Sequence, residues 1–273
     1  MKEFFGFGGY QRPAEGFLSW QHLTFVTLLM VIMAVSAVLL GRRRRHADEK
    51  AKNRVLVVAA LLMDGFEIFK LVLCCFRAGS AESLLLNLPL FLCSIQLITL
   101  PLAAFSRGRL KEAALDFVLI FGLLGAVFGT YGAGNNYGTY PVLCFDNVIS
   151  GLTHAVAGFA SLYIAIAGMA SMKKKNIGIT FAIITGFCAA ALVADILIPY
   201  NYMFLMNHDG TPYSIFYNLV NGNKVLYPII VVALFLAYIA LFYGAFYMIA
   251  GRRAKAAAAA PTEEPVAEPV AKN

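Results

Sequence analysis

Residues 17–45, FLSWQHLTFVTLLMVIMAVSAVLLGRRRR, decide the fold class of this chain. About 20 mostly apolar residues in a helix span the hydrocarbon layer of a membrane, and an arginine run beside such a helix stays in the cytoplasm. The stretch therefore predicts a spanning helix whose amino end faces outward. The whole chain has the same character, because 60% of its residues are hydrophobic and 14% are charged. Soluble domains carry about a quarter charged residues.

Further apolar runs of similar length follow, and basic residues fill every second connection between them. This alternation predicts an extracytoplasmic amino terminus and a cytoplasmic carboxyl terminus. We expect an extracytoplasmic segment at 1–16, a transmembrane domain at 17–250 and a disordered cytoplasmic tail at 251–273, in the plasma membrane of a bacterium. The fold class is all-α, a polytopic bundle of seven transmembrane helices at Phe17–Leu40, Val55–Phe76, Leu84–Phe105, Ala113–Tyr131, Val148–Ala170, Ile177–Pro199 and Leu226–Ala250.

The net charge of +7 does not indicate nucleic-acid binding. The basic residues stand directly beside apolar runs, where they orient helices and contact anionic lipid headgroups. No pair of cysteines has zinc-ligand spacing beside histidines, so no metal or cofactor is predicted. The five cysteines are Cys74, Cys75, Cys93, Cys144 and Cys188.

Polar residues inside the predicted helices gather in the outer half of the membrane. At about 1.5 Å per residue, Cys93 lies about 14 Å below the outer end of its segment and His154 about 9 Å below. Ionisable groups at this depth indicate function, while the alternative is hydrogen bonding between packed helices. Glu67 and Lys70 stand three residues apart and are expected to pair. We expect an outward-facing polar cavity supported by His22, Glu67, Lys70, Ser94, Gln96, Asp195, Asn201 and Tyr202.

Within this set, Cys93 and His154 form the pair suited to covalent chemistry. A thiol beside an imidazole exists in part as the thiolate, which is the nucleophilic form. The two residues lie on different helices at similar depth. The alternative is that Cys93 packs as a small hydrophobe and that His154 only joins two helices. The predicted catalytic residues are Cys93 as nucleophile and His154 as base.

Four short stretches give the chain a resemblance to a known family. They are LSWQHL at 18–23, LPLFLCSIQL at 88–97, GLTHAVAG at 151–158 and PYNYMFL at 199–205. In order and topology they resemble the YwaF/TMEM164 family of bacterial and eukaryotic membrane proteins. The resemblance implies a phospholipid acyltransferase that moves fatty acyl chains between phospholipids through a cysteine with a histidine partner. It places that cysteine at Cys93 and that histidine at His154.

The implied mechanism needs two supporting roles. Asp195 or Glu67 would orient His154, and Gln96, Ser94 or Asn201 would donate hydrogen bonds to the oxyanion. The outer position of the pair favours a phospholipid acyl donor over cytoplasmic acyl-CoA, so the substrate is a membrane phospholipid. The chain departs from its bacterial relatives at two positions, where Phe91 replaces a histidine and Ala155 replaces a serine.

Other functions fit the same sequence. A small-solute transporter or solute-binding membrane protein would use an outward-facing polar cavity, and its mark would be helices broken near the midplane. Gly65, Pro89 and Gly186 are the candidate break points. A seven-helix receptor or photoreceptor is a further alternative, but a retinal Schiff base within residues 226–250 is excluded because they contain no lysine. A structural role without chemistry remains open, as does the oligomeric state.

Overall fold

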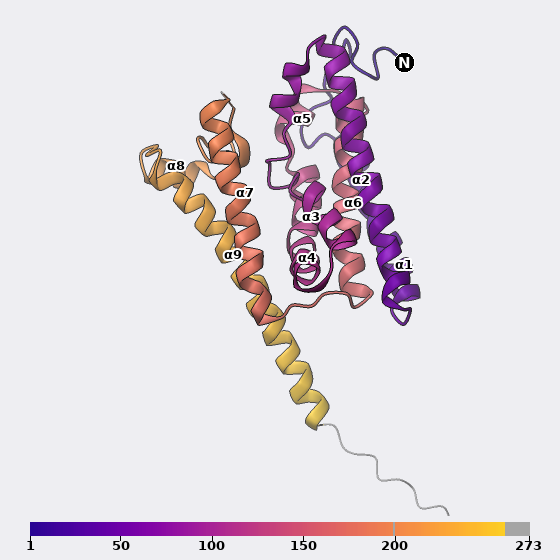
Figure 1. The fold of residues 1–273 in the computed structure, drawn as a ribbon. Helices are drawn as coiled ribbons and strands as arrows, with labels where there is room; N and C mark the ends of the chain where they lie inside the picture. The colour runs from indigo at the N-terminus through magenta and orange to yellow at the C-terminus, as the bar shows by residue number, and fades with distance from the viewer. Residues whose placement is uncertain (199, 260–273) are drawn as a thin grey trace, which may run out of the picture.

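The computed structural model describes residues 1–198 and 200–259, with side chains described up to residue 252. These residues form helices joined by turns and contain no strand (Figure 1). The helices are α1 (Trp20–Arg44), α2 (Glu49–Ala78), η1 (Ala81–Asn87), α3 (Gln96–Phe105), α4 (Gly108–Tyr131), α5 (Gly134–Thr139), α6 (Phe145–Ile166), η2 (Lys174–Asn176), α7 (Ile177–Leu197), η3 (Tyr202–Phe204), α8 (Ser214–Leu219) and α9 (Leu226–Ala259).

Within the described residues, five helices are long and apolar enough to cross a membrane, namely α1, α4, α6, α7 and α9. Two of the seven predicted spans do not meet that measure. Helix α2 has 30 residues but carries Asp64, Glu67 and Lys70 in its apolar part. The other predicted span, Leu84–Phe105, is divided between η1 and the 10-residue α3. Seven spans and their orientation therefore stay a prediction, while the all-helical membrane character is established.

The break in the Leu84–Phe105 segment follows from Pro89. Proline lacks an amide hydrogen, and its ring pushes the preceding residue out of the helical region. Leu88 accordingly has φ −61° and ψ 146°, an extended conformation. Residues 88–95 form bends and turns until α3 begins at Gln96. The other two candidate break points, Gly65 and Gly186, lie inside the unbroken helices α2 and α7.

Small residues hold α4 and α6 together at the centre of the bundle. A Cβ atom added to Gly122 of α4 would lie 2.6 Å from the Ala157 carbonyl oxygen of α6. One added to Gly158 of α6 would lie 2.6 Å from Ala126 Cβ of α4. Such close backbone approach is the main way in which helices associate inside lipid, where the hydrophobic effect between helices is absent. Helices α1, α2 and α3 pack around this pair.

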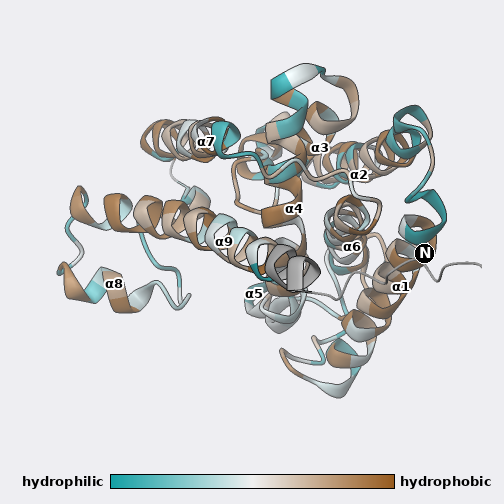
Figure 2. Cartoon of the chain, turned by 90° about the horizontal axis from the view of Figure 1, so that it is seen from below, coloured by the Kyte–Doolittle hydropathy of each residue, from teal (hydrophilic) through white to brown (hydrophobic). Residues whose placement is uncertain are grey.

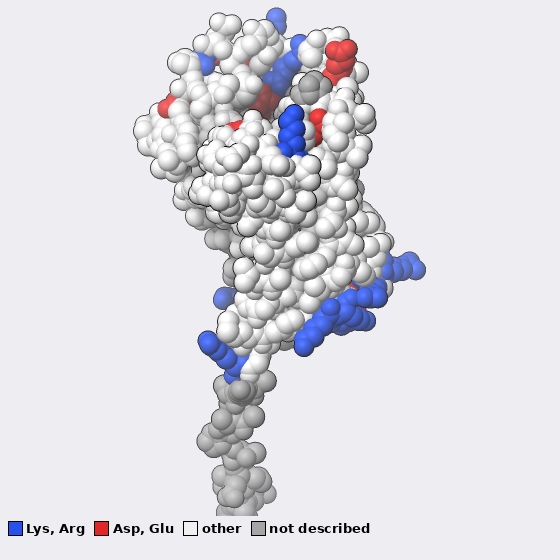
Figure 3. All heavy atoms as spheres, turned by 90° about the vertical axis from the view of Figure 1, so that its left-hand side faces the viewer, with Lys and Arg blue, Asp and Glu red and all other residues white. Residues whose placement is uncertain are grey.

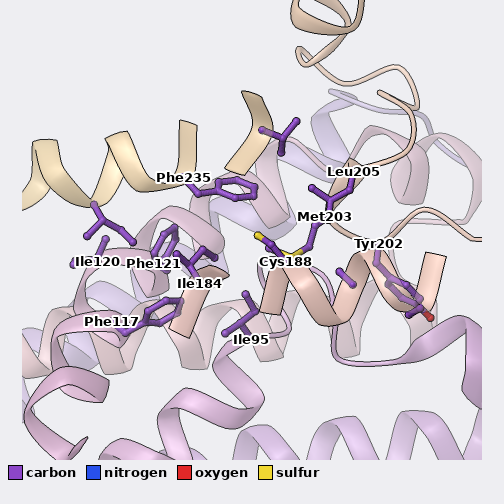
Figure 4. Packing of buried hydrophobic residues seen from close by; sticks show 14 of the residues in the cluster. Ile95, Phe117, Ile120, Phe121, Ile184, Cys188, Tyr202, Met203, Leu205 and Phe235 are labelled. Carbon is purple, nitrogen blue, oxygen red and sulfur yellow. The ribbon is translucent and has the colours of Figure 1, made fainter. Parts of the chain in front are cut away.

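Helices α7 and α9 form a separate arm that leans away from the other helices (Figures 1 and 2). The arm joins α4 through one apolar cluster (Figure 4). Phe117 and Phe121 of α4 meet Ile184 and Cys188 of α7 and Phe235 of α9 there. Helix α9 continues to Ala259, beyond the predicted boundary at 250, and residues 260–273 of the predicted tail lie outside the described part.

Charge is distributed unequally between the two ends of the molecule. Lys and Arg side chains gather at the end where α1 finishes and α7 begins, and mixed charges occupy the opposite end (Figure 3). We call the opposite end, which holds the amino terminus, the outer end (Figure 1). There Arg77 of α2 forms an ion pair with Asp146 of α6 at 2.7 Å, and Tyr10 donates a hydrogen bond to the same carboxylate. Residues 1–16 are thereby attached to the outer ends of α2 and α6.

Candidate functional site

His154 lies on α6 in the third turn from the outer end of the helix. Its Nδ1 is 2.7 Å from the Ser150 carbonyl oxygen, one turn earlier on the same helix. A carbonyl oxygen only accepts hydrogen bonds, so Nδ1 carries the proton and Nε2 holds a lone pair. Nε2 is buried and has no hydrogen-bond partner among the described residues. The imidazole is therefore oriented as a free base.

Cys93 lies in the turn that immediately precedes α3. The Gln96 amide donates to the Cys93 carbonyl oxygen at 3.4 Å, which places Cys93 one turn before the first residue of the helix. The thiol is partly buried and interacts with the His154 ring and with the neighbouring Ser94 hydroxyl. No hydrogen bond of normal geometry joins Cys93 to His154. Such catalytic contacts are often loose before substrate binds.

Two glycines of α4 bring Cys93 and His154 together. A Cβ added to Gly125 would lie 3.9 Å from both Cα and Cβ of Cys93. One helical turn nearer the outer end, a Cβ added to Gly129 would lie 2.0 Å from His154 Nε2. The imidazole therefore rests directly on the bare Cα of Gly129, and the cysteine lies over the adjoining turn. This juxtaposition depends on tertiary packing, because the residues belong to three separate segments, namely the turn before α3, α4 and α6.

Two more buried polar atoms without partners belong to α2 and α3. Gln96 is 1% exposed; its Oε1 accepts a hydrogen bond from Thr99 Oγ1 at 3.0 Å, while its Nε2 has no partner among the described residues. Oδ1 of Asp64 also lacks one in that part of the chain. Leaving a buried donor or acceptor unpaired costs about 1–3 kcal/mol in proteins. We call Asp64, Gln96 and His154 the open polar cluster, a name for the unpaired atom that each carries; Arg44, Asn147, Asn176, Asp195 and Tyr227 also carry one.

The expected ion pair of α2 is present beside this cluster. Lys70 Nζ lies 2.6 Å from Glu67 Oε1, and both side chains are mostly buried. Because Glu67 is occupied by Lys70, it does not orient the imidazole as predicted. The Ser150 carbonyl oxygen has that role, and a backbone group leaves no signal in the sequence.

The other predicted cavity residues lie elsewhere. His22 belongs to the first turn of α1 and is buried against the end of α4. Its Nε2 donates to the Thr130 carbonyl oxygen at 3.1 Å, and its ring stacks on Tyr137. Its Nδ1 accepts from the Leu18 amide at 3.1 Å. Both nitrogens are thus satisfied, and the residue anchors α1.

Asp195, Asn201 and Tyr202 form a connector after α7. Asp195 Oδ1 accepts from the Tyr202 amide at 2.6 Å, while Oδ2 is buried without a partner among the described residues. The His154 Nδ1 that Asp195 was predicted to orient is bonded to the Ser150 carbonyl oxygen instead. The Tyr202 hydroxyl donates to the Leu85 carbonyl oxygen and accepts from the Leu88 amide at 3.3 Å. The Asn201 amide is bound to Asn207 and Asp209 at the surface, so it does not face Cys93. The connector supports the segment that carries Cys93.

Phe91 is one of the two positions expected to depart from the family pattern, and it packs against other aromatic rings. The Phe91 ring lies 5.2 Å from the Tyr202 ring and 6.1 Å from Phe204, so the aromatic side chain joins the broken segment to the connector.

Two apolar grooves open on the surface, one along α1 and one of about 550 Å³ between α2 and η1. Neither is lined by Cys93 or His154. Within the described residues, no three His, Cys, Asp or Glu side chains are grouped for a metal ion.

The fold and this arrangement define a helical integral membrane protein with polar residues buried among its helices. A comparison with known protein families matches residues 17–253 to the TMEM164 family. The chain belongs to the TMEM164 family, as the resemblance predicted. Neither the curated proteins nor the solved structures contain a match.

Proposed function

We propose that this protein is a phospholipid transacylase in which Cys93 carries the acyl chain and His154 moves the proton. The observation that supports this most strongly is the placement of both residues over the glycine face of α4, with the bare lone pair of His154 Nε2 beside the thiol. A base held by the Ser150 carbonyl oxygen and left without a partner is suited to deprotonate a thiol.

In the first half-reaction, His154 Nε2 takes the thiol proton and Cys93 Sγ attacks an ester carbonyl carbon of a phospholipid. The new C–S bond moves one electron pair of the carbonyl onto oxygen. When that pair returns, the C–O ester bond breaks, and the leaving alkoxide takes the proton from His154. A lysophospholipid leaves and a thioester remains. In the second half-reaction, the hydroxyl of another lysophospholipid gives its proton to His154, attacks the thioester and regenerates the thiol.

The decisive experiment uses purified protein in lipid nanodiscs containing a phospholipid with a labelled acyl chain. We expect transfer of label to added lysophospholipid, and an acyl adduct on Cys93 by intact mass when no acceptor is supplied. Cys93→Ser should abolish both signals. Cys75→Ser is the matched control, because this thiol lines the groove between α2 and η1 and should be dispensable.

Acyl-CoA serves as the competing donor in the same assay. Transfer from acyl-CoA with none from phospholipid would reject a lipid donor. Full transfer by Cys93→Ser would reject the thioester mechanism.

One observation favours solute transport as the second candidate. The membrane segment around Pro89 is broken, and broken helices near the midplane are a mark of transporters. A transporter predicts that a water-soluble ligand raises the melting temperature equally in wild type and Cys93→Ser. A shift that is absent for all tested solutes, together with an acyl adduct on Cys93, would favour the transacylase.

A further inference from the structure

Gln96 is a buried polar residue beside Cys93 to which neither half-reaction above assigns a role. Its position relative to Cys93 follows from the turn at the start of α3. The Gln96 amide bonds to the Cys93 carbonyl oxygen, which closes a turn of three residues. Side chains three residues apart in such a turn project from the same side. The carboxamide therefore lies on the side of the turn that carries the Cys93 thiol.

The orientation of this carboxamide is set by Thr99. Thr99 Oγ1 lies 3.0 Å from Gln96 Oε1 and 3.2 Å from the Ile95 carbonyl oxygen, and its one hydrogen is shared between these two acceptors. The acceptor end of the Gln96 amide is thereby held by α3 itself. The donor end, Nε2, is left buried and without a partner in the described part of the chain. Thr99 is 0% exposed and Gln96 is 1% exposed, so this donor is shielded from bulk solvent. It is free to donate to an acceptor on a molecule that enters the site.

The start of α3 presents further donors at the same place. Among the described residues, the backbone amides of Cys93 and Ser94 have no hydrogen-bond acceptor, whereas those of Ile95, Gln96 and Leu97 bond within the turn. Unpaired amides at the start of a helix carry partial positive charge toward anions. An oxygen atom bound here would therefore be stabilised more strongly as its negative charge grows.

We infer that Gln96 Nε2 is the principal oxyanion donor of this protein, completed by the Cys93 and Ser94 amides. The inference rests on the proposed transacylase function and adds a catalytic residue to it. The ligand chemistry is an acyl carbonyl. Its oxygen accepts a hydrogen bond from Gln96 and gains charge when the thiolate adds to the carbon. Of the donors considered from the sequence, the Asn201 amide is occupied at the surface.

The test compares two electrophiles that react with the same thiol. A p-nitrophenyl ester acylates Cys93 through an oxyanion, whereas iodoacetamide alkylates it by displacement of iodide and forms none. Gln96→Met keeps the volume and removes the donor, and Gln96→Glu replaces the donor with an acceptor. We expect both variants to slow acylation by about 10²–10³-fold while alkylation stays within about twofold of wild type.

Thr99→Val provides a graded control, because it leaves Gln96 in place and removes only the group that orients it. Its acylation rate should fall between those of wild type and Gln96→Met. Equal slowing of acylation and alkylation in Gln96→Met would overturn the inference, since it would show a general loss of thiol reactivity. Wild-type acylation rates in both Gln96 variants would overturn it as well.

The two proposals fail in different ways. Should wild-type Cys93 accept an acyl group from the p-nitrophenyl ester but never from phospholipid, the transacylase function is rejected and the role of Gln96 is still measured. Should Cys93 react with iodoacetamide but with neither ester, both proposals are rejected. A melting temperature recorded for each variant identifies any that does not fold, and Gln96→Met then replaces Gln96→Glu as the deciding variant.

Discussion

The open polar cluster and Asp116 at the inner end of the bundle differ in how completely their oxygen and nitrogen atoms are hydrogen-bonded. At the inner end, both oxygens of Asp116 are bonded. Oδ1 accepts from the Ser171 and Met172 amides at 2.9 and 2.8 Å, and Oδ2 accepts from the Tyr243 hydroxyl at 3.1 Å. In the open polar cluster, Asp64, Gln96 and His154 each keep a buried atom without a partner.

We interpret this difference as one between a polar residue that holds the fold together and polar residues that are available to a bound molecule. Asp116 joins α4 to the connection before α7 and to α9, so it fastens the α7–α9 arm to the bundle. Both of its carboxylate oxygens accept hydrogen bonds from groups of the protein. The open polar cluster leaves hydrogen-bonding capacity unused, which costs stability and is available to a bound molecule. The following four predictions test whether the distinction holds.

The largest expected effect is a difference in acylation rate between variants of two histidines, His154 and His22. His154→Gln removes the free base and should lower the rate of Cys93 acylation by about 10²–10⁴-fold, the range of general base catalysis. His22→Gln, the matched variant, should lower the melting temperature and leave the rate unchanged, because both nitrogens of His22 serve packing. Acylation rates and thermal melts of the two variants decide the matter. Equal rates in both would remove His154 from the mechanism.

The next largest effect is a difference in stability between variants of two aspartates, Asp116 and Asp64. Asp116→Ala leaves the amides of Ser171 and Met172 without an acceptor and removes one partner of the Tyr243 hydroxyl, and should lower the free energy of unfolding by about 3–5 kcal/mol. Asp64→Ala removes a carboxylate with a bare oxygen and should change it by less than about 1 kcal/mol. Denaturant unfolding in mixed micelles measures both. A greater loss in Asp64→Ala would contradict the distinction.

The glycine face of α4 gives a smaller, positional effect. In Gly129→Ala the new methyl group would meet His154 Nε2 at 2.0 Å, so the ring must move away from the thiol. We expect acylation to fall by about 10–10²-fold, as misplacement by about 1 Å produces in enzymes. Gly125→Ala meets Cys93 only at 3.9 Å, an ordinary contact, and should keep near-normal activity. Similar rates for the two variants would show that Gly129 does not position the base.

The smallest effect concerns a single hydroxyl at the inner end. Tyr243→Phe removes one of the bonds to Asp116 and keeps the ring packing, so the free energy of unfolding should fall by about 1 kcal/mol. Cys93 acylation should be unaffected, because the hydroxyl lies on the other side of the bundle from the outer end. An acylation rate that falls along with stability would link the two regions and weaken the contrast between them.

Much of the fold was accessible from the sequence, because apolar length and charge placement are local properties. The spans at α1, α4, α6, α7 and α9 were predicted within a few residues, apart from the carboxyl end of α9. The break after η1 was signalled by Pro89, yet the apolar run 84–105 has the same composition whether it is one helix or two. Hydropathy counts side chains and does not detect a missing backbone hydrogen bond, so the run was interpreted as one span.

The candidate site also has one part that the sequence predicts and one part that it does not. Cys93, Gln96 and His154 were found by residue type and estimated depth, both of which can be counted along the chain. Three features of the site could not be predicted in this way. They are the role of the Ser150 carbonyl oxygen, the contact of His154 with Gly129, and the hydrogen bond of Asp195 to a backbone amide. Each of these depends on the direction in which a helix face points. In an evenly apolar helix, the sequence leaves that rotation undetermined.

By itself, the sequence determined that this protein lies in a membrane, which family it resembles and which residue types reach membrane depth. Those properties sum over short stretches of chain and need no partner helix. Only the tertiary structure decided which polar groups are satisfied and which are left open. Hydrogen bonding between helices depends on their rotation and separation, and the packing of α4 against α6 through small residues sets both.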